Sequence, residues 1–412
     1  MSSSKPAVLL VTPSPLLPAD SGGRIYTWEL ASQLADRFDY HLLVMCNKDE
    51  RAQLDAGGSS LMDQYRSVFR SVTFVDRPLI PAELSRRRVL RHLWFHLRHK
   101  LPLMDVSYYS AEAVATAKRL IEQESIDLIE VDHLQMAFVK SLVPDAPAIL
   151  VNHNIETDIY PFFRTDRWSR AAMAVWLAFG WFSRRNGEAI ELKNRLGFEA
   201  KIFISPNDAT RADESCPKTV VPLPIAARAH DRAFHADPFR MLWLGGFDWP
   251  PNSVGVRWLI EEVWPLVGDR LPQAELHIVG SNPPSDLGSA DGRITFHGYQ
   301  DDVAGWRDRA DVLLAPLLTG SGVRVKIVEA LAAGLPVVST SKGCEGLAVT
   351  NGLDIVVADE PEAFADAVVG LANDPAARFR LSAGGVAYVA AQHSPTQVAA
   401  VKAEVMDKVL AR

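Results

Sequence analysis

Cysteine is scarce in this sequence of 412 residues. Its three cysteines, Cys46, Cys216 and Cys344, are scattered and form no C-x-x-C pair. An odd number of widely separated thiols argues against a disulfide framework and against a structural zinc site, which needs closely spaced ligands. We therefore expect the chain to work in a reducing compartment, the cytoplasm.

Long apolar runs are lacking as well. The longest covers residues 171–182, whereas a helix needs about 20 apolar residues to cross a bilayer. The apolar run at residues 7–11 is too short for the core of a signal peptide. We expect a chain that is neither exported nor membrane-spanning.

The sequence also lacks an excess of positive charge. The formal net charge is −7, so the molecule as a whole offers no electrostatic attraction for nucleic acid. Of all residues, 48% are hydrophobic and 23% are charged, and the chain is long enough for two domains of roughly 200 residues with separate cores. The composition predicts a soluble globular protein without a nucleic-acid partner.

Strand-like apolar runs alternate with helix-length segments along the chain, which is typical of α/β proteins with mostly parallel sheets. A strand and three prolines near residues 217–225 interrupt the alternation. We predict Rossmann-like domains at residues 1–222 and 223–395 and a C-terminal helix at residues 396–412. The expected strands are residues 7–12, 40–45, 71–76, 126–131, 148–151, 201–204, 241–244, 275–280, 293–296 and 311–314.

The most informative stretch covers residues 314–340. It reads as a strand, a loop with Gly320 and Gly322, a helix that ends at Gly334, and a further strand. Ser321 is the predicted N-cap of this helix. Helical spacing predicts a buried stripe of Val323, Ile327, Ala330 and Leu331.

The charges of this predicted helix are unusual. A helix N-terminus is already partly positive and favours acidic residues, yet Arg324 and Lys326 lie in its first turns. Two cations beside glycines that expose backbone N–H groups indicate an anion site, with Glu329 one turn later placed to accept from a pair of hydroxyls. The alternative is that both cations are solvated and the glycines only shape a turn.

Residues 320–340 read G-S-G-V-R-V-K-I-V-E-A-L-A-A-G-L-P-V-V-S-T. This run resembles the nucleotide-sugar motif of the family 4 (group 1) retaining glycosyltransferases of the GT-B fold. The resemblance covers nearly the whole second domain and rests on fewer features in the first. It implies two Rossmann-like domains facing across a cleft, with the C-terminal helix packing back on the N-terminal domain.

A second glycine loop follows the first strand. Gly22, Gly23 and Arg24 again place a cation at the start of a helix, whose predicted apolar face carries Ile25, Trp28, Ala31 and Ala35. By itself this is an ordinary first loop of a doubly wound sheet. In the family it resembles, such a loop closes over the donor diphosphate.

Polar residues follow two strands of the first domain, at the ends where α/β folds place their chemistry. Asp132 and His133 come after one strand, and His153, Asn154 and Glu156 come after another. A histidine there is often structural, but the resemblance implies that it faces the donor sugar. An alignment without gaps places Asp132 in that role instead. We assign Asp132 and the second group to the acceptor side.

The sequence departs from the family pattern at three positions. Where many members have an arginine and a lysine on the diphosphate, this chain has Gly246 and Asn252, and Ser321 replaces a glutamate. We infer that Arg324 and Lys326 supply the missing positive charge.

The resemblance implies transfer of a sugar, with retention, from a nucleoside-diphosphate sugar to an acceptor hydroxyl. Preorganised donors would stabilise the departing diphosphate, with His133, Arg324 and Lys326 as the catalytic residues and Glu329 on the ribose. Without an Asp-x-Asp motif we expect no metal ion, and no cofactor besides the donor substrate. The expected donor-binding set also includes Gly22, Gly23, Arg24, His297, Gly298, Tyr299, Gly320, Ser321 and Gly322.

Two other functions would use the same donor site. A GT-B-like nucleotide-sugar epimerase or hydrolase would need no acceptor surface. A non-catalytic nucleotide-sugar-binding protein is the other alternative, because Ser321 replaces a glutamate.

Residues 85–100 contain six Lys or Arg and no acid. Leucines and Trp94 lie on one face of the predicted helix and arginines elsewhere, which is typical of helices that bind anionic lipid; a solvated face is the alternative. The apolar stretch at residues 162–182 is either core or a second surface that faces the membrane or the acceptor. We therefore expect a sugar, polysaccharide or lipid-linked acceptor, and a peripheral position on the inner face of the plasma membrane.

Overall fold

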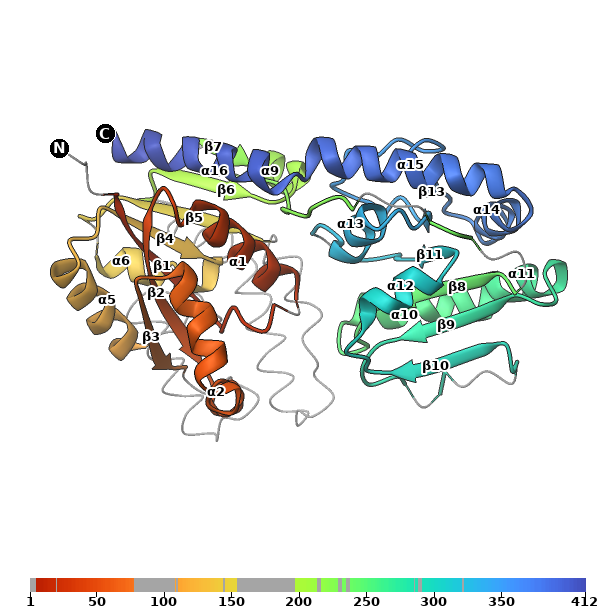
Figure 1. Cartoon of the computed structure of the whole chain (residues 1–412), viewed down its shortest axis with the longest axis horizontal. Coiled ribbons are helices and arrows are strands. Elements are labelled where there is room, and N and C mark those ends of the chain that lie inside the picture. Colours follow the sequence, from red (N-terminus) through yellow and green to blue (C-terminus); the bar gives the residue numbers. More distant parts are fainter. Residues whose placement is uncertain are drawn as a thin grey trace, which may run out of the picture. The chain divides into compact units, whose positions relative to one another are not determined.

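The protein is described by a computed structural model (Figure 1). It describes residues 5–19, 21–77, 108, 110–143, 145–153, 197–212, 216–228, 232–234, 238–284, 286–287, 291–320 and 322–412. The chain forms two compact units, one of Met1–Val221 with Val398–Arg412 and one of Pro222–Gln397.

The first unit contains a parallel sheet whose described strands have the order β3-β2-β1-β4-β5-β6-β7. The strands between the two edge strands β3 and β7 are buried on both faces of the sheet, as parallel strands require. The order reverses between β1 and β4, where α/β sheets bind ligands. The strands are β1 (Ala7–Thr12), β2 (Asp39–Cys46), β3 (Ser71–Asp76), β4 (Leu128–Asp132), β5 (Ala148–Asn152), β6 (Ala200–Phe203) and β7 (Lys218–Val220).

Helices cover both faces of this sheet. Ile129 and Val131 of β4 pack with α5 on one face, and the intervening Glu130 points to the opposite face. The described helices are α1 (Gly22–Leu34), α2 (Lys48–Val68), α5 (Ala111–Gln123), η2 (Leu134–Met136), α6 (Phe138–Leu142), α9 (Pro206–Arg211) and α16 (Pro395–Leu410).

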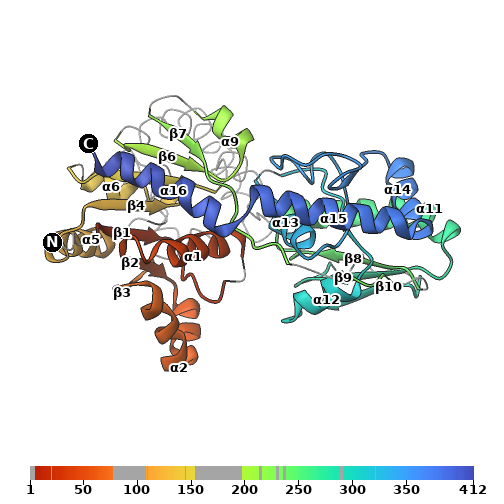
Figure 2. The same cartoon turned by 45° about the horizontal axis from the view of Figure 1, so that its top comes forward.

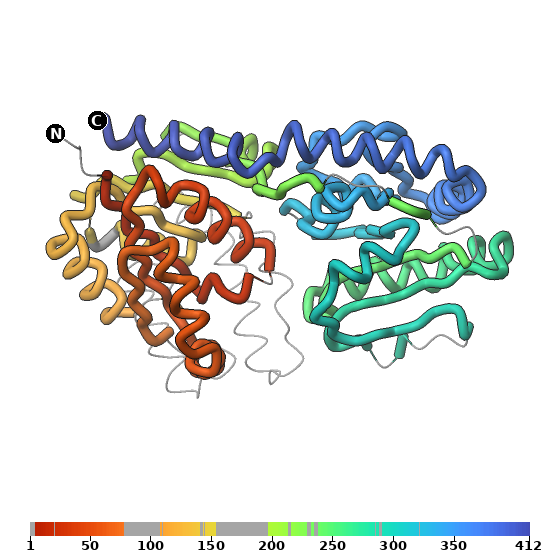
Figure 3. Tube along the Cα trace, viewed as in Figure 1, coloured from red at the N-terminus to blue at the C-terminus, as the bar shows by residue number. Residues whose placement is uncertain are grey.

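The C-terminal helix α16 returns to the unit that holds the N-terminal strand (Figure 3). Lys402 donates to Glu130 Oε1 at 2.5 Å, and both side chains are at most 2% exposed. Tyr40 of β2 donates to the sulfur of Met406, and Arg37 pairs with Asp407 at the surface. The expected packing of this helix on the N-terminal domain is therefore confirmed.

The second unit also contains a parallel sheet, with described strands in the order β10-β9-β8-β11-β12-β13. Its strands β8, β9 and β10 are labelled in Figure 2. The order reverses between β8 and β11. The strands are β8 (Arg240–Leu244), β9 (Glu275–Val279), β10 (Ile294–Gly298), β11 (Val312–Ala315), β12 (Val337–Ser339) and β13 (Val356–Val357).

Aromatic residues fill the larger core of the second unit. Trp243 of β8 is fully buried, and Trp258, Trp264 and Phe364 pack in the same cluster. A π-helical turn, η4, joins two of the helices just before Pro265, whose missing N–H accounts for the local change of helix type. The helical elements are α10 (Pro250–Trp258), η4 (Leu259–Val263), α11 (Trp264–Arg270), α12 (Val303–Arg309), α13 (Val325–Ala332), α14 (Pro361–Asn373) and α15 (Pro375–Gln392).

The structure confirms the alternation of strands and helices, with shifts of one or two residues at strand ends. Two helix predictions were wrong. Helix α13 begins at Val325 with Arg324 as its N-cap, not at Ser321, and Val323 precedes it. Helix α1 buries Tyr26, Leu30, Ala31 and Leu34 rather than the predicted face. The segments 85–100 and 162–182 lie outside the described residues.

Candidate functional site

Glycines shape the carboxyl end of β8 in the second unit. Gly245 has φ +154°, and a Cβ on Gly280 would lie 1.9 Å from the Gly245 carbonyl oxygen. A Cβ on Gly255 of α10 would likewise lie 2.2 Å from the Pro316 carbonyl oxygen. Only glycine allows these contacts, and together they fix the loops where the strand order reverses.

Lys326 of α13 lies beside this loop. Its Nζ donates to the Leu244 carbonyl at 2.7 Å and to Asn252 Oδ1 at 3.1 Å, and it lies 4.9 Å from the ring centroid of Trp243. Burial and the nearby charge of Arg324 lower the pKa of Lys326 to about 7. Within the described residues this ammonium group therefore has two neutral oxygens and no carboxylate as partners.

Arg324 is the N-cap of α13 and lies against the glycine loop. Its Nη2 is 3.4 Å from the Thr319 carbonyl oxygen, and a Cβ on Gly320 would lie 2.9 Å from that nitrogen. Gly320 and Gly322 have φ of +95° and +85°, a region that disfavours other residues. The glycines thus hold the loop close to a cation at the positive end of a helix.

Glu329 lies one turn further along α13. Its Oε2 accepts from Arg307 Nη1 of α12 at 2.6 Å, and the two side chains are 28% and 10% exposed. A carboxylate fixed by a buried arginine has a defined orientation, which suits an acceptor for vicinal hydroxyls.

The predicted base-binding residues follow β10. His297 Nε2 lies 3.1 Å from His277 Nδ1 of β9, and its ring is 4.2 Å from that of Trp306. Gly298 has φ +66°, and Tyr299 is 69% exposed. An exposed aromatic ring beside a glycine turn offers a surface on which a planar base can stack.

In the first unit, Asp132, His133 and His153 form one cluster at the carboxyl ends of β4 and β5. Asp132 Oδ1 lies 2.6 Å from His153 Nε2, and Asp132 Oδ2 lies 3.1 Å from His133 Nδ1. The two imidazole rings stack at 3.8 Å with 8° between their planes. The carboxylate therefore holds one nitrogen of each ring.

Burial separates the two candidates for the donor-facing role. Asp132 is 2% exposed, whereas the His133 side chain is 23% exposed. His133 also has φ +71°, a conformation that costs about 1–3 kcal/mol in a non-glycine residue and clusters at functional sites. This geometry favours His133 over Asp132 as the residue that a ligand reaches.

The protonation states follow from the surroundings. Burial alone would raise the pKa of Asp132, but the two histidines outweigh it and hold that pKa well below its usual range. Burial and the neighbouring His133 lower the pKa of His153, against the opposing effect of Asp132. At neutral pH we therefore assign an ionised Asp132 that accepts from a neutral His153.

These three residues could in principle ligate a metal ion, since their ligand atoms lie within 4.8 Å of one another. The lone pairs of two stacked imidazoles lie in nearly parallel planes, however, and do not converge on one point. Metal binding would require one ring to turn out of the stack.

The first loop contacts this cluster within the same unit. A Cβ on Gly23 would lie 3.3 Å from His133 Nε2 and 3.5 Å from His153 Nδ1. Gly22 and Gly23 are the first residues of α1, and the nearest carboxylate to Arg24 in the described structure is Glu50 at 3.7 Å. The charge of Arg24 thus has an acidic neighbour within its own chain.

Not every predicted site residue lies in the described structure. Ser321, Asn154 and Glu156 fall outside it. Sequence reasoning missed Arg307 and His277, which contact Glu329 and His297. No sequence signal marks them, because both contacts join residues at least 20 positions apart.

Comparison with known proteins bears directly on this site. Residues 238–374 match the family model described as "Glycosyl transferases group 1". The resemblance to group 1 glycosyltransferases is confirmed. The match includes the β8 loop, α12 and α13, and therefore Lys326, Arg307 and Glu329.

Curated relatives share part of this chain. An uncharacterized protein of the cps region of Klebsiella pneumoniae is 28% identical over 32% of the chain and 37% of its own length. The phosphatidyl-myo-inositol mannosyltransferase of Mycobacterium leprae is 32% identical over 35% of the chain and 40% of its own length. The alignments thus span less than half of these relatives.

Solved structures match over nearly the whole chain. A sucrose-phosphate synthase from Thermosynechococcus elongatus matches with a TM-score of 0.69 and 16% identity, over 99% of this chain and all of the other. Anabaena HepE in complex with UDP matches with a TM-score of 0.62 and 14% identity, over 98% and 100% of the two chains. With these GT-B neighbours the fold of the chain is confirmed as GT-B.

Every helix within the described ranges is too short or too polar to cross a bilayer.

Proposed function

We propose that this chain is a retaining glycosyltransferase that moves a sugar from a nucleoside-diphosphate sugar to an acceptor hydroxyl. The observation that carries the proposal is Lys326, whose largely buried ammonium group contacts two neutral oxygens and the ring of Trp243 but no carboxylate in the described structure. A buried cation without a counter-ion is costly, and an incoming diphosphate would supply the missing negative charge. The match of residues 238–374 to group 1 glycosyltransferases supports this interpretation.

In this proposal the diphosphate, the ribose and the base of the nucleotide sugar each have a partner in the second unit. Lys326 and Arg324 would bind the diphosphate and stabilise the charge that develops as it leaves. Glu329, held by Arg307, would accept from the ribose hydroxyls. The segment of His297, Gly298 and Tyr299 would hold the base.

The first unit would serve the transferred sugar and the acceptor. His133 is the partly exposed member of the histidine cluster, and Asp132 fixes its Nδ1. That contact leaves Nε2 as the ring nitrogen directed toward the loop of Gly23. An imidazole whose Nε2 carries no proton can accept from a sugar hydroxyl in this orientation.

The acceptor class is inferred from the relatives. Several are named phosphatidyl-myo-inositol mannosyltransferases, and one belongs to a cps region. We propose a lipid-linked or polysaccharide acceptor, used at the inner face of the plasma membrane. The basic segment of residues 85–100 would provide the membrane contact.

The decisive experiment measures donor binding and turnover in purified variants. Lys326→Ala and Arg324→Ala should each weaken binding of the nucleotide sugar by about 10-fold to 100-fold, because each removes a charge-assisted contact. Lys342→Ala is the matched control, since Lys342 lies in the same unit and pairs with Glu345 at the surface. Wild-type binding and turnover in both site variants would refute the proposal.

Stereochemistry and metal use need separate assays. The proton NMR spectrum of the product should show the same anomeric configuration as the donor. Activity should persist in excess EDTA, because the two cations supply the charge that a metal ion otherwise would. An inverted product contradicts retention, and a loss of activity that magnesium or manganese restores contradicts metal independence.

A further inference from the structure

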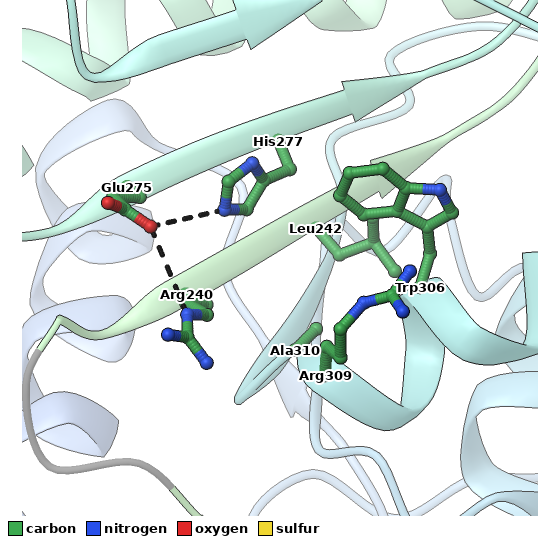
Figure 4. A pocket seen from close by; sticks show the side chains of 7 residues that line it. All are labelled: Arg240, Leu242, Glu275, His277, Trp306, Arg309 and Ala310. Atoms are coloured by element: carbon green, nitrogen blue, oxygen red, sulfur yellow. Dashed lines mark ion pairs between the residues drawn. The ribbon is translucent and has the colours of Figure 1, made fainter. Parts of the chain in front are cut away.

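A small pocket opens in the second unit at the edge of the sheet opposite the proposed donor site. Its lining includes Arg240 and Glu275, the first residues of β8 and β9, together with Trp306 and Arg309 of α12 (Figure 4). The proposed donor groups lie instead at the carboxyl ends of these parallel strands. The pocket volume of about 230 Å³ suits a molecule smaller than a typical drug-sized ligand.

The pocket carries more positive than negative charge. Arg309 makes no ion pair or hydrogen bond within the described residues, and its guanidinium lies 5.1 Å from the ring centroid of Trp306. Arg240 is 3.9 Å from Glu275, which is too long for a hydrogen bond. Glu275 is thus paired with Arg240 alone, and the guanidinium of Arg309 is the group that an oxyanion entering the pocket would find available.

Apart from His277, the rest of the lining is apolar. Leu242, Ala310 and the indole of Trp306 complete the pocket. Figure 4 shows Glu275 and Arg240 on one side, and Trp306 with Arg309 on the other. An aromatic face opposite a carboxylate suits a ring that offers C–H groups to the indole and hydroxyls to Glu275.

A hydrogen-bonded chain leads from this pocket to the proposed base-binding segment. His277 Nε2 lies 3.3 Å from Glu275, and His277 Nδ1 lies 3.1 Å from His297 Nε2. Burial lowers the pKa of His277, against the raising effect of Glu275, so the neutral ring donates from Nε2 and accepts at Nδ1. A ligand that draws on Glu275 therefore changes the partner of a ring that orients His297.

We propose that this pocket is a second ligand site, which binds a small ring compound bearing one oxyanion, such as a phosphorylated or carboxylated monosaccharide. The charge of the ligand pairs with Arg309, its ring packs on Trp306, and its hydroxyls donate to Glu275. Occupancy changes the affinity for the nucleotide through His277 and His297. This last step alone rests on the proposed function.

The binding test uses calorimetry on the full chain with four probes. Glucose 6-phosphate and glucuronate should bind, inorganic phosphate should bind more weakly because it lacks the ring, and glucose should not bind. A preference between the first two distinguishes a phosphate from a carboxylate ligand. Failure of both ring anions to bind at millimolar concentration would overturn the proposal.

Variants locate the bound probe. Arg309→Gln should weaken glucose 6-phosphate binding by about tenfold or more. Arg270→Gln should not, since Arg270 is an exposed arginine of α11 that pairs with Asp366. Arg324→Gln, in the proposed donor site, should also leave binding intact. Binding that is lost in Arg324→Gln and kept in Arg309→Gln would place the anion at the donor site and refute a second site.

The link to the nucleotide is tested with UDP as the probe. Saturating glucose 6-phosphate should change the dissociation constant of UDP by about fivefold or more, and His277→Leu should abolish this change. If the ring anion binds through Arg309 and UDP affinity does not change, the communication step is wrong. If neither UDP nor any other nucleoside diphosphate binds, the proposed function fails, while the first two tests still decide whether the second site exists.

Discussion

Lys326 is a cation held where its charge is disfavoured. Because its pKa in the unoccupied protein is about 7, much of this lysine is neutral above that pH. A bound diphosphate would raise the pKa again, so binding takes up a proton. We expect donor affinity to fall as the pH rises through 7, and proton uptake to appear in calorimetry as a dependence on the buffer's ionisation enthalpy.

Lys326→Arg is the control for this prediction, since a guanidinium stays charged throughout this range. Its donor affinity should vary little with pH. Wild-type affinity that is constant across pH 7, without proton uptake, would show that Lys326 is already fully charged before the donor binds.

His133 combines a strained backbone with a fixed side chain. Asparagine tolerates positive φ better than most residues and can still donate to Asp132, so His133→Asn should keep the unfolding free energy within about 1 kcal/mol of wild type. Turnover should fall by about 100-fold or more if the imidazole acts on the substrate. Steady-state kinetics measures the turnover, and denaturant unfolding measures the unfolding free energy. Unchanged turnover would assign His133 a structural role only.

At this scale the sequence predicted single residues better than pairs. Arg324 and Lys326 were recognisable because cations are unusual at a helix N-terminus. The partners of Glu329 and His297 were not, because Arg307 and His277 reach them only once α12 and β9 have been placed in the fold. The stacking of His133 on His153 likewise depends on the pairing of β4 with β5.

Among the elements, α16 makes the clearest energetic contribution. Lys402 and Glu130 form a buried ion pair, and removal of one partner from such a pair typically costs about 3–5 kcal/mol. Lys402→Met should therefore lower the unfolding free energy of the first unit by about that amount, measured by chemical denaturation. Lys408→Met, which breaks an exposed pair with Glu404 on the same helix, should cost about 0.5 kcal/mol or less.

The double variant Glu130→Leu with Lys402→Met completes the test. Two apolar side chains leave no buried charge, so most of the lost stability should return. A double variant that is less stable than Lys402→Met would show that Glu130 stabilises the unit through contacts other than Lys402.

The elements also show where sequence patterns fail. The strands were predicted well because their apolar runs are buried on both faces. The predicted start of α13 was wrong because Gly320 and Gly322 both adopt positive φ, which extends the preceding loop as far as Arg324. The predicted buried face of α1 was wrong because Trp28, although large, is only partly buried and packs edge-on against Tyr65.

For the whole molecule, the basic segment of residues 85–100 opposes the net charge of −7. Each basic side chain near an anionic leaflet contributes about 1 kcal/mol. We predict salt-sensitive binding to anionic vesicles and weak binding to neutral ones in flotation assays. Replacing Arg87, Arg91 and Arg98 by glutamine should reduce binding to the anionic vesicles.

The control replaces Arg66, Arg70 and Arg119, three arginines of the same unit outside this segment, by glutamine. It should leave flotation unchanged. Equal flotation on anionic and neutral vesicles at low salt would contradict the prediction and indicate a solvated segment with a soluble acceptor.

The return of α16 to the first unit also sets an order of events on the ribosome. The strands of the first sheet are synthesised early, but Lys402, the ion-pair partner of Glu130 in the described structure, is available only once residue 402 has left the exit tunnel. The second unit, contiguous from Pro222 to Gln397, is complete before then and can fold first. A nascent chain released after Gln397 should therefore contain a protease-resistant second unit beside a first unit that is still open to cleavage.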